Sequence, residues 1–207
     1  MRRLRRDGRI WAALAFVLAG ALLGCAATLL FVGPRESEDV EPSEVDVGFA
    51  QDMGVHHQQA LDMSALALAN SDDQFVLAMA QQILQAQAGE RGILRGWLTL
   101  WKAPQLPSGP PMEWMAEAHE GHGDHGSHEE GMPGMATPAQ MQELAELEGA
   151  AFDAEFVALM TAHHEGGVMM ARYAADHAAL PEVRSLAMLM VEEQIEELSL
   201  LAGRAAA

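Results

Sequence analysis

The feature that most constrains the fold of this chain is an internal repeat, in which one pattern of residues occurs twice at an offset of 107 positions. The first copy comprises Asp46, Phe49, Met53, His56, His57 and Met63, and the second comprises Asp153, Phe156, Met160, His163, His164 and Met170. The same offset relates Val76, Ala80, Gln87 and Glu90 to Val183, Ala187, Gln194 and Glu197. Identical polar residues at a fixed offset do not arise from composition bias alone, so each copy is predicted to be one structural unit.

The spacing within each copy is that of an α-helix. Phe49, Met53, His56, Ala60 and Met63 follow one another at steps of four, three, four and three, as do their equivalents between 156 and 170. This spacing places the residues on one helical stripe that faces a core. Ala, Leu, Met, Gln and Glu, which favour helices, dominate the composition. We therefore predict an all-α protein in which two helical hairpins form a four-helix bundle.

Several residues mark the expected helix ends. Asp46 and Asp153 stand near the starts of the first helices as candidate caps. Asp72 and Pro181 fit the first turns of the second helices. A short extra helix is expected from about 138 to 148, opened by Thr137 as its cap.

The N-terminal segment predicts export. Residues 10–33 are nearly uncharged and long enough to span a bilayer, and five arginines precede them. We expect residues 1–33 to form a cytoplasmic basic stub and a single-pass transmembrane helix, with the remaining chain outside the cytoplasm. The alternative is lipidation at Cys25, which follows Leu-Leu-Gly as in a bacterial lipobox. Residues 34–45 are acidic, contain two prolines and are expected to form a flexible spacer.

The bundle domain is expected to span 46–204, with the repeats at about 46–102 and 153–204 and an insert at 103–137 that lacks helical periodicity. The His and Met residues of the insert, spaced by three within each group, are Met112, Met115, His119, His122, His125, His128, Met132 and Met135. Such a tract favours a secondary metal site over simple solvation. Trp114 either shields a bound cation with its ring face or docks the insert on the bundle.

The chemistry of these side chains predicts a soft metal ion. Thioether sulfur binds Cu(I) and Ag(I) but contributes little to Zn, Mg or Mn sites, and imidazole binds copper in either oxidation state. The chain has 14 methionines and nine histidines, whereas its one cysteine precedes the predicted domain. Copper is therefore the predicted ligand, as Cu(I), with Ag(I) or Cu(II) as alternatives. Imidazole competes with protons near a pKa of about 6.5, whereas methionine does not titrate.

The main metal site is predicted where the stripes of the two repeats face each other. Its candidate ligands are Met53, His56, His57, Met63, Met160, His163, His164, Met169 and Met170. The alternative is that these residues are core methionines and hydrogen-bonded core histidines. Glu90 and Glu197 also occupy inward positions, where they either orient an imidazole or pair with arginines. His177 is not repeated and is predicted to lie on the surface, and Gly166 with Gly167 indicates a close helix approach or a kink.

Charge excludes one class of partner. From residue 33 onward seven Lys or Arg face 29 Asp or Glu, so a nucleic-acid backbone would be repelled. The acidic surface either gathers cations or only keeps the domain soluble. The expected partners are the metal ion, the membrane through residues 10–33, and a protein that donates or accepts copper.

The pattern Asp-x-x-Phe-x-x-x-Met-x-x-His-His, followed six residues on by Met, occurs at 46–63 and at 153–170. It resembles domain-of-unknown-function family 305, which includes CopM-like exported copper-binding proteins. The resemblance covers 46–201 apart from the insert. It implies a ferritin-like four-helix bundle and a copper-ligand role for the eight repeated His and Met residues. It implies nothing for the insert.

The favoured function is the sequestration, buffering or handover of copper in metal tolerance. One alternative is a ferritin-like di-iron oxidase, but such sites use Glu-x-x-His, which occurs nowhere in the sequence. We therefore expect a binding protein and not an enzyme. The other alternative is a helical interaction module with structural or acid-sensing histidines.

Overall fold

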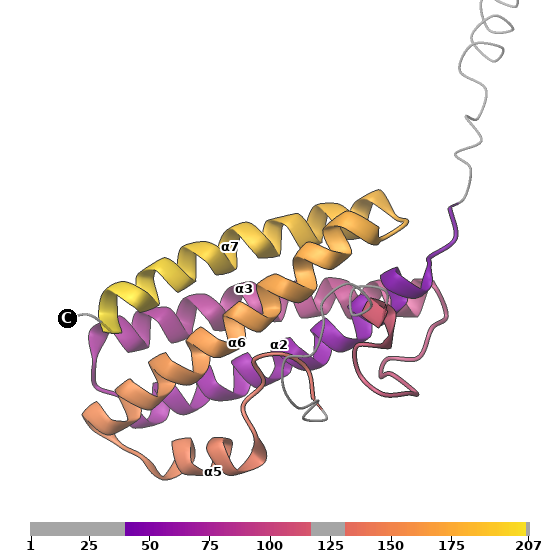
Figure 1. Cartoon of the computed structure of the whole chain (residues 1–207). Helices are drawn as coiled ribbons and strands as arrows, with labels where there is room; N and C mark the ends of the chain where they lie inside the picture. The colour runs from indigo at the N-terminus through magenta and orange to yellow at the C-terminus, as the bar shows by residue number, and fades with distance from the viewer. Residues whose placement is uncertain (1–39, 117–130, 206–207) are drawn as a thin grey trace, which may run out of the picture. The chain divides into compact units, whose positions relative to one another are not determined.

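The computed structural model describes residues 40–116 and 131–205 (Figure 1). These residues form five α-helices and one short 3-10 helix, without a strand. The elements are α2 (Glu44–Asn70), α3 (Gln74–Leu100), η1 (Glu113–Met115), α5 (Pro138–Glu146), α6 (Gly149–His177) and α7 (Pro181–Ala205). The repeats thus fold as two helical hairpins, α2–α3 and α6–α7, in agreement with the predicted all-α bundle.

Two helix starts follow the sequence prediction. Pro181 is the first residue of α7, where its missing N–H costs nothing. Thr137 caps α5 through a capping box, in which its hydroxyl accepts from the Gln140 N–H and the Gln140 side chain accepts from the Thr137 N–H. This helix ends at Glu146, two residues before the predicted end.

Two other caps differ from the prediction. The cap of α2 is Ser43, and Asp46 is the third residue of the helix, completing a capping box with Ser43. The cap of α3 is Asp73, whose carboxylate accepts from the N–H groups of the first turn, and Asp72, which was predicted to lie in that first turn, precedes the cap. Asp153 lies within the first turns of α6 and does not cap it.

The repeated aspartates have a different role, which the structure makes clear. The Asp46 carboxylate accepts hydrogen bonds from the Ala179 and Leu180 N–H groups, each at 3.0 Å, in the turn between α6 and α7. Asp153 accepts from the Ser71 hydroxyl at 2.5 Å, at the turn between α2 and α3. Each aspartate therefore fastens the start of its own hairpin to the turn of the other.

The helices α2 and α6 form the centre of the bundle. Helix α2 packs along α3, α6 packs along α7, and α2 and α6 also pack against each other. In contrast, the backbones of α3 and α7 have few or no close contacts. This arrangement brings the stripes of the two repeats face to face between α2 and α6. The candidate ligands of both repeats therefore share one interior.

The core divides into two apolar clusters. One contains Phe49, Met53, Leu94, Leu98, Val168, Met170, Ala171, Val183, Ala187 and Met190. The other contains Ala60, Met63, Val76, Ala80, Ile83, Phe152, Phe156, Met160 and Leu201. Along each long helix a buried polar stretch separates the residues of one cluster from those of the other. The middle of the bundle is therefore a polar layer enclosed at both ends by apolar side chains.

The predicted fold class requires one correction, because it included a transmembrane helix before the bundle. No helix in the described part of the chain is both long and apolar enough to cross a bilayer, so the structure does not support a membrane-spanning element. The segment 10–33 on which that prediction rested, Cys25 and most of the spacer lie outside the described residues.

Candidate metal centre

The polar layer consists of repeat-related pairs of residues. They are His56 and His163, His57 and His164, Gln87 and Gln194, and Glu90 and Glu197, and all are buried. The histidines are at most 1 % exposed, so bulk water does not reach them. Burying this many polar groups is costly unless each finds a partner, so the partners of each side chain indicate what the layer is built for.

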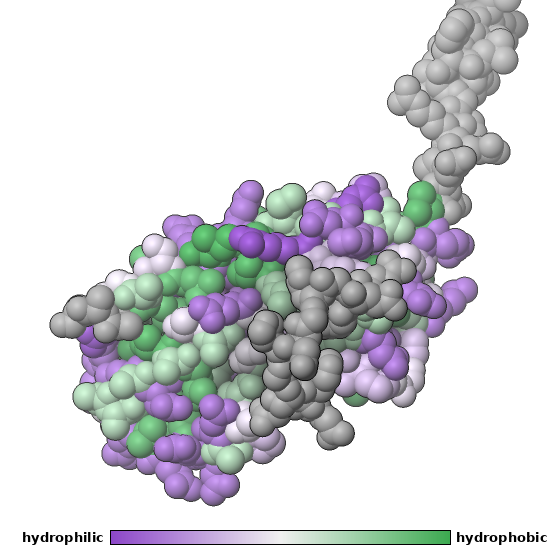
Figure 2. Space-filling model, viewed as in Figure 1, coloured by the Kyte–Doolittle hydropathy of each residue, from purple (hydrophilic) through white to green (hydrophobic). Residues whose placement is uncertain are grey.

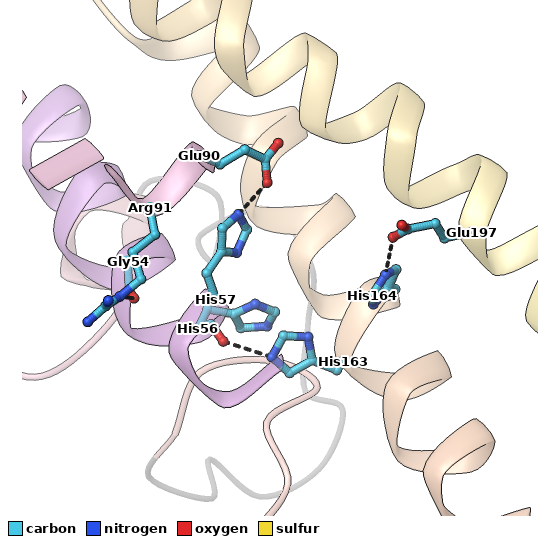
Figure 3. A network of polar contacts seen from close by, with 8 residues as sticks. All are labelled: Gly54, His56, His57, Glu90, Arg91, His163, His164 and Glu197. Carbon is cyan, nitrogen blue, oxygen red and sulfur yellow. Dashed lines mark hydrogen bonds and ion pairs between the residues drawn. The ribbon is translucent and has the colours of Figure 1, made fainter. Parts of the chain in front are cut away.

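Each of the four imidazoles is held through its Nε2 atom, and Figure 3 shows these contacts for His57, His163 and His164. His57 Nε2 lies 2.8 Å from the Glu90 carboxylate, and His164 Nε2 lies 2.6 Å from that of Glu197. His163 Nε2 is 2.9 Å from the backbone carbonyl of His56, across the interface between α2 and α6. His56 Nε2 is 3.1 Å from the carbonyl of Pro133, which belongs to the insert.

These partners determine which nitrogen carries the proton. A backbone carbonyl oxygen or an ionised carboxylate only accepts hydrogen bonds, so the Nε2 atoms of His56 and His163 donate, and those of His57 and His164 donate to Glu90 and Glu197 in their ionised form. A neutral imidazole that donates from Nε2 has a lone pair on Nδ1. The Nδ1 atoms of His56, His57, His163 and His164 are all buried without a hydrogen-bond donor. Four buried Nδ1 atoms without a partner, on rings fixed by acceptors at the opposite nitrogen, match the way metal-binding histidines are oriented.

Burial keeps the rings of His56, His57 and His163 neutral, because it lowers the pKa of each. Burial, with a further contribution from neighbouring histidines, lowers the pKa of His56 and of His57 from 6.5 to about 3. Burial also places the pKa of His163 well below its usual value. The rings of His56 and His163 lie face to face, with centroids 3.8 Å apart and planes tilted by 32°, a contact that two imidazolium ions would not tolerate.

Burial has the opposite effect on the carboxyl group next to His57. It raises the pKa of Glu90 from 4.5 to about 7, because desolvation disfavours the charged form. A cation in the layer would stabilise the ionised carboxylate and, through it, the Nε2-protonated form of His57. Glu90 and Glu197 therefore hold imidazoles, which is the first of the two roles that the sequence allowed.

The amides of Gln87 and Gln194 add to the unsatisfied groups. Both atoms of each amide are buried without a hydrogen-bond partner in the protein. Gly167 makes room for Gln194, because a Cβ at position 167 would lie 2.3 Å from the Gln194 Oε1 atom. This contact, and not a kink, explains one of the two helical glycines.

The family assignment follows from a match to the model of the domain of unknown function DUF305, which covers residues 46–204. This chain is a DUF305 protein. The match includes both repeats and the segment between them. Among curated proteins, none is similar enough to this chain to count as a match.

Solved DUF305 structures share the fold. A DUF305 protein from Streptomyces coelicolor that is thought to be secreted has 41 % identity and a TM-score of 0.70, over 78 % of this chain and 92 % of that one. A DUF305 fragment from Deinococcus radiodurans has 30 % identity and a TM-score of 0.65, over 80 % and 97 % of the chains. CopM in its Cu(II)-bound form has 26 % identity and a TM-score of 0.58, over 78 % and 95 %.

The predicted localisation in the membrane is wrong on two grounds. The described helices of this DUF305 chain contain no membrane span, and the Streptomyces coelicolor relative is thought to be secreted. The predicted membrane partner is therefore also without support.

The methionines lie on either side of the polar layer. Met53 and Met170 belong to one apolar cluster, Met63 and Met160 to the other, and all four are fully buried. Each cluster thus contains one of these methionines from each repeat. Met169 differs, because it is 46 % exposed and belongs to neither cluster.

Met169 is one of several large apolar side chains at the surface, and the face in Figure 2 likewise shows hydrophobic areas among hydrophilic ones. The structure does not bring Met169 to the other candidates.

The layer is not a preformed cage of hard ligands. Within residues 40–116 and 131–205, no three His, Cys, Asp or Glu side chains surround a common position where an ion could sit. An ion bound here must therefore use thioether or amide atoms beside imidazole, or the side chains must turn. A site that depends on sulfur suits Cu(I) or Ag(I) better than hard divalent cations.

The two ends of the insert are docked on the bundle. Trp114 and Met115 are buried, and Met112 and Met132 pack against the cluster that contains Phe49. Trp114 donates its Nε1–H to Asp52 at 2.8 Å, so it docks the insert, as one of its two predicted roles required. Met135 is partly exposed. The four histidines of the insert, His119, His122, His125 and His128, lie outside the described residues.

Sequence reasoning missed several residues of α2 that contact the insert. Asp52 accepts from both the Met112 N–H and the Trp114 indole, Gly48 leaves space for the Trp114 ring, and Gln59 bonds the backbone of Ala136. They occupy α2 at helical spacing, but their repeat equivalents differ. That difference at the 107-residue offset was the one available signal.

Proposed function

We propose that this protein binds a soft metal ion, Cu(I) and also Ag(I), in the polar layer between α2 and α6, and that it sequesters or hands over copper outside the cytoplasm. The observation that carries the proposal is the set of four buried Nδ1 lone pairs, each on a ring whose Nε2 is already committed to an acceptor. A buried acceptor without a donor is unfavourable, and a cation satisfies it.

The low pKa of the histidines supports this function. A metal ion competes with protons for imidazole nitrogen. Because the pKa of His56 and His57 is about 3, protons do not occupy these sites at neutral or mildly acidic pH. The same property weakens the alternative of an acid-sensing module, which needs a histidine that titrates near physiological pH.

The relatives support the choice of metal. CopM has been solved in Cu(II)-bound, Cu(I)-bound and Ag-bound forms. The described domain has no cysteine, so its soft ligands are thioethers, which remain available in an oxidising compartment where thiols do not. A location outside the cytoplasm agrees with the relative that is thought to be secreted.

We further propose binding in place of catalysis. In the di-iron oxidases the carboxylates themselves bridge and hold the metals. Here Glu90 and Glu197 are each used to hold an imidazole. The absence of Glu-x-x-His from the whole sequence points in the same direction.

The proposal is tested by Cu(I) competition titration of the full chain and of the variant His56→Ala/His163→Ala. We expect the variant to lose about tenfold or more in affinity, the usual cost of removing a ligand or its support. His177→Ala is the matched control, because His177 is exposed and stacks on Tyr173 outside the layer. Equal affinity in the two variants, both folded by circular dichroism, would exclude the layer as the site.

The role of sulfur needs a separate variant. Replacing Met53 and Met160 by Leu keeps nearly the same volume and removes only the thioethers. We expect Cu(I) affinity to fall by about tenfold while Cu(II) affinity changes little, because thioether sulfur prefers the softer ion. If both ions bind the Leu variant as well as the original chain, these methionines only fill the core.

A further inference from the structure

Residues 131–136 of the insert, which end immediately before the α5 cap Thr137, contact both α2 and α6 at the polar layer, and we call this segment the strap. On its α2 side, Gln59 holds the strap through two hydrogen bonds. The Gln59 amide donates to the Ala136 carbonyl at 2.8 Å and accepts from the Ala136 N–H at 2.7 Å. The side chain thus pairs with the strap backbone as a neighbouring strand would.

On its α6 side, the strap lies against helix backbone that only glycine permits. A Cβ at Gly166 would lie 2.0 Å from the Pro133 carbonyl oxygen, so no larger residue fits there with the strap in place. Gly134 has φ +73° and lies next to the Ala162 carbonyl. Gly166 is the repeat equivalent of Gln59. At this repeat position, α2 has a side chain that bonds the strap, and α6 has a glycine that leaves space for it.

The strap also sets the state of one imidazole in the layer. His163 donates to a helix carbonyl, that of His56, whereas His56 donates to the strap carbonyl of Pro133. The docked strap therefore favours the tautomer of His56 that has its proton on Nε2 and its lone pair on Nδ1. Of the four histidines, His56 is the one whose ring is oriented by the insert.

Access to the layer requires some part of its cover to move, because its four histidines are at most 1 % exposed. The long helices that surround it are continuous and packed along their lengths. The strap is irregular, and its polar attachment is a few side-chain bonds. Its residues Met132 and Met135 are partly exposed thioethers beside Pro133 and Gly134.

We propose that the strap is the wall of the metal layer that opens for the ion, and that Gln59 is the positioning residue that holds it closed. Gln59 acts through Pro133 on His56 and does not contact the metal. The proposal rests on the metal-binding function given above. It predicts that loosening the strap changes the rates of metal exchange more than the equilibrium affinity.

The test measures Ag(I) association and dissociation rates on the full chain and on Gln59→Ala. Gln58→Ala is the matched control, because Gln58 directly precedes Gln59 on α2 and its amide donates to Asp62 on the exposed face. Losing the two bonds to Ala136 should raise both rates by roughly thirtyfold, because one ordinary hydrogen bond corresponds to about a fivefold change in an equilibrium. The imidazole ¹⁵N signals of His56 should also move away from the Nε2-protonated pattern in Gln59→Ala only.

A second variant, Gly166→Ala, displaces the strap from the other helix. Its matched control is Gly54→Ala, where an added Cβ meets nothing. Alanine favours helix over glycine, so faster exchange in Gly166→Ala cannot be attributed to a weakened α6. If neither strap variant exchanges Ag(I) faster than its control, the strap proposal is overturned while metal binding stands. If the original chain does not take up Ag(I), the metal-binding function fails first, and the strap proposal fails with it.

Discussion

The helices α2 and α6 carry the same residues toward the polar layer but different residues toward the insert. Their shared positions are His56 and His163, His57 and His164, Met53 and Met160, and Met63 and Met170. Three of the positions that differ are Gly48 and Glu155, Asp52 and Leu159, and Gln59 and Gly166. The first member of each of these three pairs contacts the insert. The repeat thus builds a symmetric interior, and the departures from the repeat attach the insert to one side of it.

This difference makes two matched histidines unequal. His163 is held by the backbone of α2 and His56 by the insert, although they occupy equivalent positions and their rings lie face to face. The symmetric positions explain why four lone pairs meet in one layer. The unsymmetric ones explain how that layer is covered. Properties of the shared layer and of the insert contacts should therefore respond to different changes.

The largest expected effect concerns the shared layer and is its sensitivity to acid. The pKa of His56 and of His57 is about 3 in the folded protein and 6.5 in the reference state. Between these values the unfolded chain binds more protons, so the free energy of unfolding falls as the pH falls. Glu90, with its pKa raised from 4.5 to about 7, acts oppositely between those two values, because there the folded state holds the extra proton.

Below pH 4.5 the opposing contribution of Glu90 has ended, whereas that of the histidines with a lowered pKa continues. Urea unfolding of the metal-free protein should therefore show the steepest loss between pH 4.5 and 3, with His56, His57 and His163 each contributing up to about 1.4 kcal/mol per pH unit. The variant His56→Gln/His163→Gln should have a shallower slope in this range. The same slope in both proteins would mean that these imidazoles are already protonated in the folded state.

The acid behaviour also shows what the sequence could not provide. The pairing of His and Met at helical spacing predicted which side chains share the interior, because periodicity reports on burial. An ordinary imidazole pKa near 6.5 was the only available assumption for a sequence. Burial next to other histidines changes that value, and it depends on the packing of α2 against α6. Acidification to pH 5 consequently does not separate histidine ligands from methionine ligands in this protein.

The contacts of the insert were harder to predict for a different reason. Its composition indicated a tract separate from the bundle, and Trp114 gave the one sign of docking. The partners of Asp52, Gly48 and Gln59 are backbone groups and a Trp ring that lie more than 50 residues further along the chain. No local sequence pattern predicts contacts over such a separation. Asp46 was misassigned as a cap for the same reason, since its partners Ala179 and Leu180 lie in the other hairpin.

The next largest effect concerns the insert side of the comparison. Trp114→Ala removes a buried indole, its edge contact with the Phe49 ring at 5.8 Å between centroids, and its bond to Asp52. We expect a loss of about 3 kcal/mol or more in the free energy of unfolding, the usual cost of truncating a buried Trp. Urea unfolding at pH 7 measures it.

The comparison variant for Trp114→Ala replaces His119, His122, His125 and His128 by Ser. We expect this variant to unfold at the same urea concentration as the original chain while binding fewer metal ions. If the histidine variant is the less stable of the two, the insert is anchored through its histidines and Trp114 is not its main attachment.

The smallest expected effect is a difference in stability between variants of Asp46 and Asp153, which are repeat equivalents with different hydrogen-bond partners. Asp46→Ala loses charged hydrogen bonds to three backbone N–H groups, one of Ser43 in the cap of α2 and two of Ala179 and Leu180 in the other hairpin, whereas Asp153→Ala loses one to a hydroxyl. Hydrogen bonds to charged groups contribute about 1.5 to 3 kcal/mol each, so Asp46→Ala should be the less stable variant by about 1.5 kcal/mol or more. Asp62→Ala, on the exposed face of α2, controls for the loss of charge. Equal unfolding midpoints for the Asp46 and Asp153 variants would mean that the two turns are fastened equally and that the bundle is symmetric at its ends as well as in its polar layer.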